Sequence, residues 1–298
     1  MATPSPRRKP DPTGVNDRDF VTRFAPSPSG PAHRGHAFSA LTAFAAARHA
    51  GGRFLLRLED IDAARCRPAF EAAMLSDLAW LGLAWERPVR RQSEHLADYR
   101  AALATLEARG LLYRCFRTRK EVMDDIGRAP HASPSALAPG PLDPAEEARM
   151  IDEGRPFAWR LSLAAAERAL GGFSDLHFIE EGAGPAGEHG VIAARPDLAG
   201  DVILARKDLG VSYHLAVVVD DAAQGVTHVI RGEDLHSAAH VQRLLQALLD
   251  LPTPVYRHHR LLLREDGRRF AKRDTAETLA NLRARGVTAE ALRAELGF

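Results

Sequence analysis

The 298-residue sequence predicts an α/β fold built on a Rossmann-like parallel sheet. Residues 20–58 show strand, helix and strand patterns in succession, which is how a right-handed parallel crossover begins. Later segments such as residues 211–220 are almost continuously apolar, as expected of strands that are buried on both faces. A hydrophobic content of 45% is ample for a core in a chain of this length.

The first strand and the first helix are joined by a turn suited to an anion. Residues 21–25 form the expected strand, and after a Pro- and Gly-containing turn residues 37–50 form an alanine-rich helix. The first N–H groups of that helix and its dipole favour a phosphate. His33 and His36 can donate hydrogen bonds to phosphate oxygens, and Gly35 allows a ligand to approach the backbone. For so short a motif, a zinc site or two solvent-facing histidines remain alternatives.

The rest of the chain continues the pattern of strands and covering helices. Gly82, Gly110 and Pro252 are expected helix stops. The remaining expected elements are, in order, helices at 69–81 and 93–109, a loop at 131–141, a short helix at 144–153, strands at 157–163, 201–205 and 211–220, a helix at 240–251 and a strand at 255–263. The segment 211–220 is expected to be a buried parallel strand because of its apolar run.

Composition and charge exclude several classes of protein. Residues 1–18 have no apolar stretch, so they are expected to be a disordered tail rather than a signal peptide or a membrane span. The net charge of +1 gives no overall basic character, although residues 257–273 form a basic cluster. Cys66 and Cys115 are too few for a disulfide framework. We therefore expect a cytoplasmic enzyme that does not enter a membrane.

Six segments together carry a family resemblance. Residues 23–36 resemble the ATP-binding signature of class I aminoacyl-tRNA synthetases, usually His-Ile-Gly-His, and the flanking residues are similar to the glutamyl branch. Five further segments agree in the family's order. They are residues 57–62, 200–208, 213–221, 225–235 and 269–273, the last at the place of the second signature loop, Lys-Met-Ser-Lys-Ser. The resemblance spans residues 20 to about 275, most of the chain.

The resemblance implies a domain organisation. A Rossmann-like catalytic domain of the class I synthetase type would occupy residues 19–112 and 200–275, interrupted by an inserted acceptor-type subdomain at 113–199. Residues 276–298 would form a short C-terminal helical segment, too short for an anticodon-binding domain.

The resemblance also implies site residues for ATP. His33, Gly35, His36 and Lys272 would bind ATP, and His33, His36 and Lys272 would act in catalysis by stabilising charge on the phosphates. Mg²⁺ is expected to accompany ATP. The second loop departs from the family pattern because it reads Arg269-Phe270-Ala271-Lys272-Arg273. Arg34, inside the first motif, is expected to face solvent.

Glutamate would be bound by a second set of residues that the resemblance supplies. They are Arg23, Phe24, Ala25, Pro26, Ser27, Glu59, Tyr213 and Arg231. Guanidinium groups suit carboxylates, and a glutamate side chain suits an α-ammonium group.

Each of these charged residues has a purely structural alternative. Glu59 could pair with Arg57 or Arg53, Arg231 could neutralise Glu233, and Tyr213 could be a core aromatic residue.

Relatives of this type often hold zinc through a Cys-x-Cys pair, a Tyr and a further Cys. Here the pair reads Cys115-Phe116-Arg117, and no cysteine follows it. One thiolate with the distant His131 makes a poor zinc site, so we predict no structural zinc.

Three functions follow from the resemblance. The first is that of a truncated glutamyl-tRNA synthetase paralogue, which activates L-glutamate with ATP in the absence of tRNA and attaches it to queuosine in the anticodon loop of tRNA(Asp). The second is a truncated glutamyl-tRNA synthetase that charges a tRNA acceptor end, and the third is a non-catalytic RNA-binding relic. The short segment after the second loop favours the first, and a monomer is expected.

Overall fold

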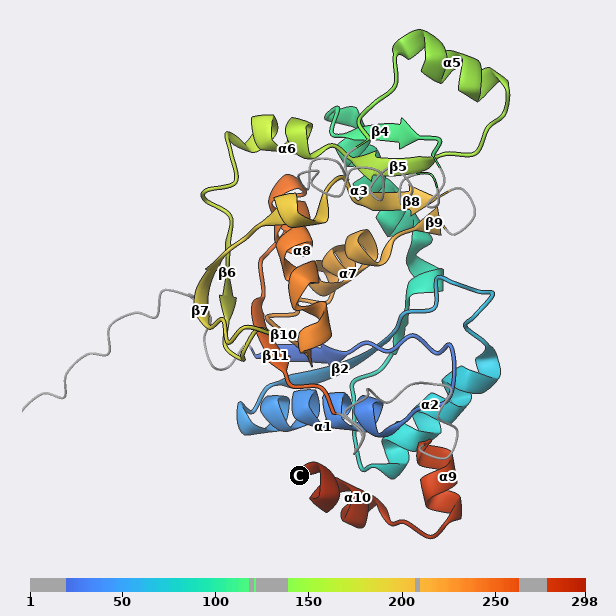
Figure 1. The fold of residues 1–298 in the computed structure, drawn as a ribbon. Coiled ribbons are helices and arrows are strands. Elements are labelled where there is room, and N and C mark those ends of the chain that lie inside the picture. The colour runs from blue at the N-terminus through green and yellow to red at the C-terminus, as the bar shows by residue number, and fades with distance from the viewer. Residues whose placement is uncertain (1–19, 118–120, 122–138, 207–209, 263–277) are drawn as a thin grey trace, which may run out of the picture.

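The computed structural model describes residues 20–117, 121, 139–206, 210–262 and 278–298 (Figure 1). The expected tail at 1–18, most of the loop at 131–141 and the second signature loop with Lys272 lie outside these ranges.

A seven-stranded sheet forms the centre of the molecule. Its order is β3 (Arg90–Arg91), β2 (Arg53–Leu58), β1 (Val21–Phe24), β10 (His228–Gly232), β11 (Val255–His259), β6 (His177–Glu180) and β7 (Gly190–Ala193). Neighbouring strands are parallel from β3 to β6, and β7 runs antiparallel at the edge. The structure therefore confirms the α/β class with a Rossmann-like parallel sheet.

Helices cover both faces of this sheet (Figure 1). On one face lie α1 (Arg34–His49), α2 (Pro68–Trp80), α9 (Leu279–Ala284) and α10 (Ala289–Leu296), and on the other lie α3 (Leu96–Ala108), α7 (Tyr213–Ala223) and α8 (His236–Leu248). Alternate strand residues supply the two cores, since Leu55 and Val229 belong to one cluster and Leu56 and Ile230 to the other.

A second sheet has four antiparallel strands. It contains β4 (Leu112–Cys115), β5 (Ala158–Leu161), β8 (Ile203–Arg206) and β9 (Gly210–Val211), accompanied by α5 (Pro144–Asp152) and α6 (Leu163–Leu170). The domain boundaries expected at 112/113 and 199/200 do not coincide with the division between the sheets. Strands β6 and β7 lie in the large sheet, whereas β8 and β9 lie in the small one.

One predicted element is wrong. Residues 211–220 were expected to be a strand, but most of them form the helix α7. The Ser212 side chain caps this helix by accepting a hydrogen bond from the Leu215 N–H. Leu215, Val218 and their neighbours pack into the core from the helix, because burial on a helix overrides the strand preference of valine.

The C-terminal helices are tied to the start of α1. The Leu279 N–H donates to the Ala32 carbonyl, and Leu282, Leu292 and Leu296 are buried in the same core as α1. Arg34 was expected to face solvent. Its guanidinium group instead contacts Glu295 at 2.9 and 3.2 Å. Within the described ranges, no helix is long and apolar enough to cross a membrane.

Candidate active site

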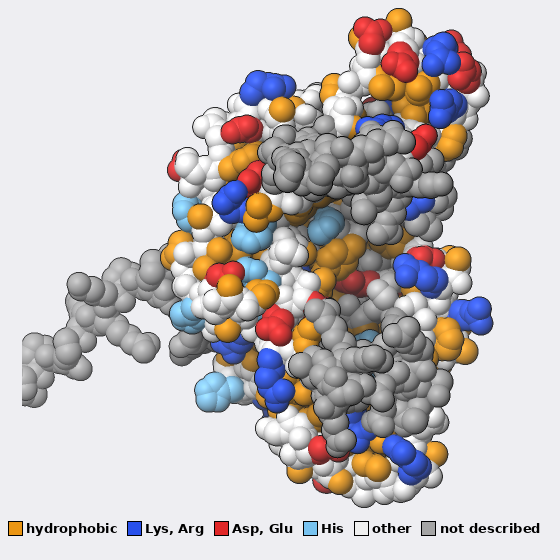
Figure 2. All heavy atoms as spheres, viewed as in Figure 1, with side chains coloured by type: hydrophobic (Ala, Val, Ile, Leu, Met, Phe, Trp, Pro, Cys, Tyr) orange, Lys and Arg blue, Asp and Glu red, His pale blue; other side chains and the backbone are white. Residues whose placement is uncertain are grey.

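A cavity of about 500 Å³ opens where β1 and β10 end beside the start of α1. The carboxyl ends of parallel strands are the usual place for a ligand in such a sheet. Figure 2 shows a hollow in this face of the molecule, in which hydrophobic, acidic and histidine side chains are visible. All eleven predicted site residues that the structure describes line this cavity: Arg23, Phe24, Ala25, Pro26, Ser27, His33, Gly35, His36, Glu59, Tyr213 and Arg231.

The histidine motif caps α1. The Nδ1 atom of His33 accepts a hydrogen bond from the Gly35 N–H at 3.1 Å, and the Nδ1 atom of His36 accepts one from the His33 N–H at 3.2 Å. A Cβ atom on Gly35 would lie 3.0 Å from the His33 ring. Gly35 is therefore needed for the close packing of His33 on the helix, and the two rings, 3.9 Å apart, sit together at the helix mouth.

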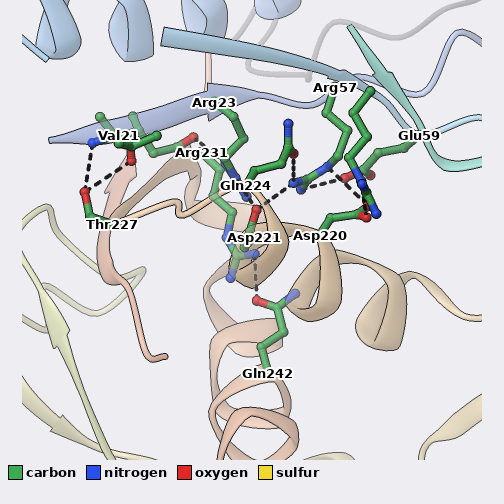
Figure 3. Close-up of polar contacts among 12 residues, drawn as sticks. Val21, Arg23, Arg57, Glu59, Asp220, Asp221, Gln224, Thr227, Arg231 and Gln242 are labelled. Carbon is green, nitrogen blue, oxygen red and sulfur yellow. Dashed lines mark hydrogen bonds and ion pairs between the residues drawn. The ribbon is translucent and has the colours of Figure 1, made fainter. Parts of the chain in front are cut away.

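Arg23 is paired with a carboxylate from the other half of the chain. Its Nε atom donates to Asp221 Oδ1 at 2.9 Å, and both side chains are buried (Figure 3). Arg57, which is completely buried, donates to the same oxygen at 2.7 Å. Burial alone would raise the pKa of Asp221, but Arg23 and Arg57 outweigh it and hold the pKa below its ordinary value.

Arg57 links this pair to Glu59 and Asp220. Its Nη2 atom lies 3.4 Å from Glu59 Oε1, and its Nε atom lies 3.6 Å from Asp220 Oδ2. Asp220 also accepts hydrogen bonds from Arg90 and from the Tyr99 hydroxyl. The only sequence signal for this network was the pair of carboxylates that follows the apolar run, so the structural role of the network was missed.

The carboxyl group of Glu59 lies at the cavity wall and has a raised pKa. Its side chain is 11% exposed at the cavity wall. Burial and the nearby carboxylates of Asp221 and Asp220 raise the pKa of Glu59, against the opposing effect of Arg57 and Arg23. The alternative partner Arg53 instead contacts Glu86 at 2.6 Å. Glu59 thus pairs with Arg57 and still faces the cavity.

Arg231 is held by neutral acceptors. Its guanidinium group donates to His258 Nε2 at 3.1 Å, Gln242 Oε1 at 2.9 Å and the Leu235 carbonyl at 3.0 Å. It also donates to the Tyr213 hydroxyl at 3.3 Å. Among the residues that the structure describes, no carboxylate forms an ion pair with Arg231.

The proposed structural alternatives for Arg231 and Tyr213 fit less well. Glu233 accepts a hydrogen bond from the Leu261 N–H rather than pairing with Arg231. Tyr213 lines the cavity and directs its hydroxyl at Arg231. The cavity therefore presents a cation that none of the described carboxylates pairs with directly, which suits an incoming carboxylate.

The relatives of this chain point to one family. The family described as "tRNA synthetases class I (E and Q), catalytic domain" matches residues 19–147 and 187–297. A protein of Rhodobacter capsulatus named glutamyl-Q tRNA(Asp) synthetase is 49% identical, over 94% of this chain and 100% of its own length. A glutamate–tRNA ligase of Prochlorococcus marinus is 38% identical over 91% of this chain, which spans 56% of that protein.

A solved structure agrees with these relatives. The glutamate tRNA ligase of Elizabethkingia meningosepticum, in complex with its amino acid, superposes with a TM-score of 0.68 at 25% identity. The match covers 86% of this chain and 52% of the ligase. By its matching sequence and its fold, the chain belongs to the class I aminoacyl-tRNA synthetases, in the family of the glutamyl and glutaminyl catalytic domains.

Proposed function

We propose that this protein activates L-glutamate with ATP in the absence of tRNA and transfers the glutamyl group to queuosine in the anticodon loop of tRNA(Asp). The observation that carries the proposal is the cavity itself, which is lined both by Arg231, whose described hydrogen-bond acceptors are neutral, and by the histidine-capped start of α1. A relative that matches over its full length and is named for this activity supports it.

In the activation step, an oxygen of the glutamate α-carboxylate attacks the α-phosphorus of ATP. A new O–P bond forms, the bond between the α-phosphorus and the bridging oxygen breaks, and pyrophosphate leaves. His33, His36 and the N–H groups at the start of α1 would stabilise the phosphates, together with Lys272. Mg²⁺ would be bound with ATP, because this cation prefers phosphate and water oxygens.

Glutamate recognition would use charges of both signs. Arg23 and Arg231 would attract its carboxylates, with Tyr213 beside Arg231, and Glu59 would receive the α-ammonium group. Ser27 and the backbone of residues 24–26 would complete the pocket wall. The arginines beside the glutamate carboxylates, and the histidines and Lys272 beside the phosphates, would offset the repulsion between glutamate and ATP.

The test is glutamate-dependent pyrophosphate exchange without tRNA, followed by transfer of labelled glutamate to tRNA(Asp) with and without queuosine. Exchange without tRNA and label only on queuosine-containing tRNA(Asp) is the expected result. Exchange that requires tRNA(Glu) would favour a truncated glutamyl-tRNA synthetase, and its complete absence would favour a non-catalytic relic. We further propose that the protein is a cytoplasmic monomer and that it holds no structural zinc.

A further inference from the structure

Arg231 rests against a buried histidine that the sequence did not single out. His258 lies in β11 directly beside Arg231 in β10, and the two residues are register partners. Its side chain is completely buried, as is that of Glu180 in β6. The His258 Nδ1 atom lies 2.5 Å from Glu180 Oε2, while its Nε2 atom lies 3.1 Å from Arg231 Nε. Three neighbouring strands thus supply a carboxylate, an imidazole and a guanidinium in a row.

The partners assign the tautomer of His258. A guanidinium Nε–H can only donate, so His258 Nε2 must accept from Arg231. The ring proton therefore sits on Nδ1 and is donated to Glu180. Burial is the main cause that lowers the pKa of His258, and Arg231 and His236 also lower it, against the effect of Glu180. A neutral imidazole fits this arrangement.

Glu180 is itself fixed by the backbone. Its Oε1 atom accepts hydrogen bonds from the His258 N–H at 2.9 Å and from the Gly182 N–H at 2.8 Å. Burial would raise the pKa of Glu180, but these donors and the His258 ring outweigh it, so the pKa lies below its ordinary value. The group is therefore an anchored carboxylate that holds the imidazole in one orientation.

A metal site is the competing explanation for this cluster. Ligand atoms of Glu180, His236 and His258 lie within 4.8 Å of one another, and among the described residues His236 Nε2 has no hydrogen-bond partner. However, both nitrogens of His258 are already engaged, one of them by a cation. A metal ion would have to break one of these bonds and sit close to the Arg231 charge, which the geometry disfavours.

We propose that Glu180 and His258 are positioning residues for Arg231 in glutamate recognition. The imidazole fixes the guanidinium while keeping the Glu180 carboxylate one ring away, so that Arg231 is oriented without being directly ion-paired. This inference rests on the proposed function, because the ligand that Arg231 receives is the carboxylate of glutamate.

Two substitutions at His258 separate the roles of its two ring nitrogens. In His258→Gln, the side-chain oxygen reaches the place of Nε2 and can still accept from Arg231. In His258→Asn, the shorter amide occupies the place of Nδ1 and still donates to Glu180, but the acceptor for Arg231 is lost. The KM for glutamate in pyrophosphate exchange is expected to rise about tenfold to a hundredfold in the Asn variant and less than about threefold in the Gln variant.

The kinetic pattern distinguishes positioning from a general structural effect. The KM for ATP is expected to stay unchanged in both variants, and kcat is expected to change less than the KM for glutamate. His240→Asn is the matched control, because His240, like His258, packs edge-on against His236 but contacts neither Arg231 nor Glu180 through any described hydrogen bond. Calorimetric binding of glutamate gives the same comparison without catalysis.

Each other result overturns a defined part of the inference. Equal KM values in the Asn and Gln variants, with exchange intact in the wild type, would remove the positioning role and leave the proposed function standing. Stoichiometric metal in the purified wild-type protein, lost in His236→Ala, would show that Glu180, His236 and His258 form a metal site instead of positioning Arg231. A wild type that neither exchanges nor binds glutamate would overturn both proposals.

Discussion

The two arginines of the pocket differ in how their charge is balanced. Arg23 shares the Asp221 carboxylate with Arg57, in a network of buried ion pairs that continues to Asp220 (Figure 3). Within the part of the chain that the structure describes, the groups that accept hydrogen bonds from Arg231 are neutral, and Glu180 lies behind the His258 ring. The first arrangement joins distant segments, whereas the second leaves a charge available to a ligand. The difference leads us to expect that the Arg23 network stabilises the fold as well as the pocket, whereas Arg231 acts mainly in the proposed binding of glutamate.

The largest expected effect tests the structural half of that comparison. Asp221→Asn leaves Arg23 and Arg57 buried with one anion fewer, so the free energy of unfolding should fall by about 3–5 kcal/mol. Urea denaturation measures it. The matched control is Glu86→Gln, which breaks the exposed pair with Arg53 and should cost less than about 1 kcal/mol. Equal losses in the two variants would contradict a special role for the buried network.

Arg231→Gln tests the binding half. Loss of a desolvated cation opposite a carboxylate should lower kcat/KM for glutamate by a factor of about 100 to 1,000. The free energy of unfolding should fall less than in Asp221→Asn, because no buried carboxylate loses a direct partner. Steady-state pyrophosphate exchange and urea denaturation of the same samples decide this. The comparison fails if the fold suffers more than the affinity for glutamate.

The pH dependence sharpens the comparison through Glu59. Because its pKa is raised, mainly by burial, Glu59 takes up a proton at a higher pH than an ordinary glutamate. The KM for glutamate should therefore begin to rise on acidification while Asp221, whose pKa is lowered, is still charged. Because the pKa of Glu59 is raised in the folded state, its protonation stabilises the fold as the pH falls through that pKa. Acidification should therefore weaken glutamate binding, by removing the charge of Glu59, without unfolding the protein.

Glutamate KM values measured against pH, with circular dichroism at each pH, check this expectation. Glu59→Gln should have a KM for glutamate about tenfold higher at neutral pH and should lose this part of the pH profile. A profile identical to that of the wild type would exclude Glu59 as the group that titrates.

The smallest effect concerns the ATP side, which the comparison leaves aside. Gly35→Ala would place a Cβ atom 3.0 Å from the His33 ring and displace it from the helix cap. A lost cap costs about 1 kcal/mol, so the KM for ATP should rise about fivefold. The KM for glutamate should not change. A rise in both KM values would show that the two halves of the pocket are coupled.

The sequence predicted the local features of the pocket better than the distant ones. The turn after β1 and the helix that follows could be predicted because Pro, Gly and alanine-rich segments act over a few residues. The apolar run at 211–220 could not be assigned, since length and burial allow either a strand or a helix there. Its Ser212 cap was the available signal for a helix.

The resemblance supplied the predicted site residues, but not the neighbouring side chains that position them. Arg23 and Arg231 were identified from motifs, whereas the pairing with Asp221 depends on how α7 packs on the sheet and the contact with His258 depends on strand register. No pattern in the sequence places His258 beside Arg231 rather than on the surface. The prediction for Lys272 remains open because it lies outside the described residues.

The central position of β1 has a consequence for synthesis on the ribosome. Its neighbours are β2, which follows soon in the chain, and β10, and Arg23 lies 198 positions from Asp221. A nascent chain must therefore keep β1 with one edge unpaired, and Arg23 without its carboxylate, until most of the protein has emerged. Such late pairing is slow and exposes the edge to wrong partners. A fragment that ends before β10 also lacks Arg231, so the proposed glutamate site can form only after β10 has been synthesised.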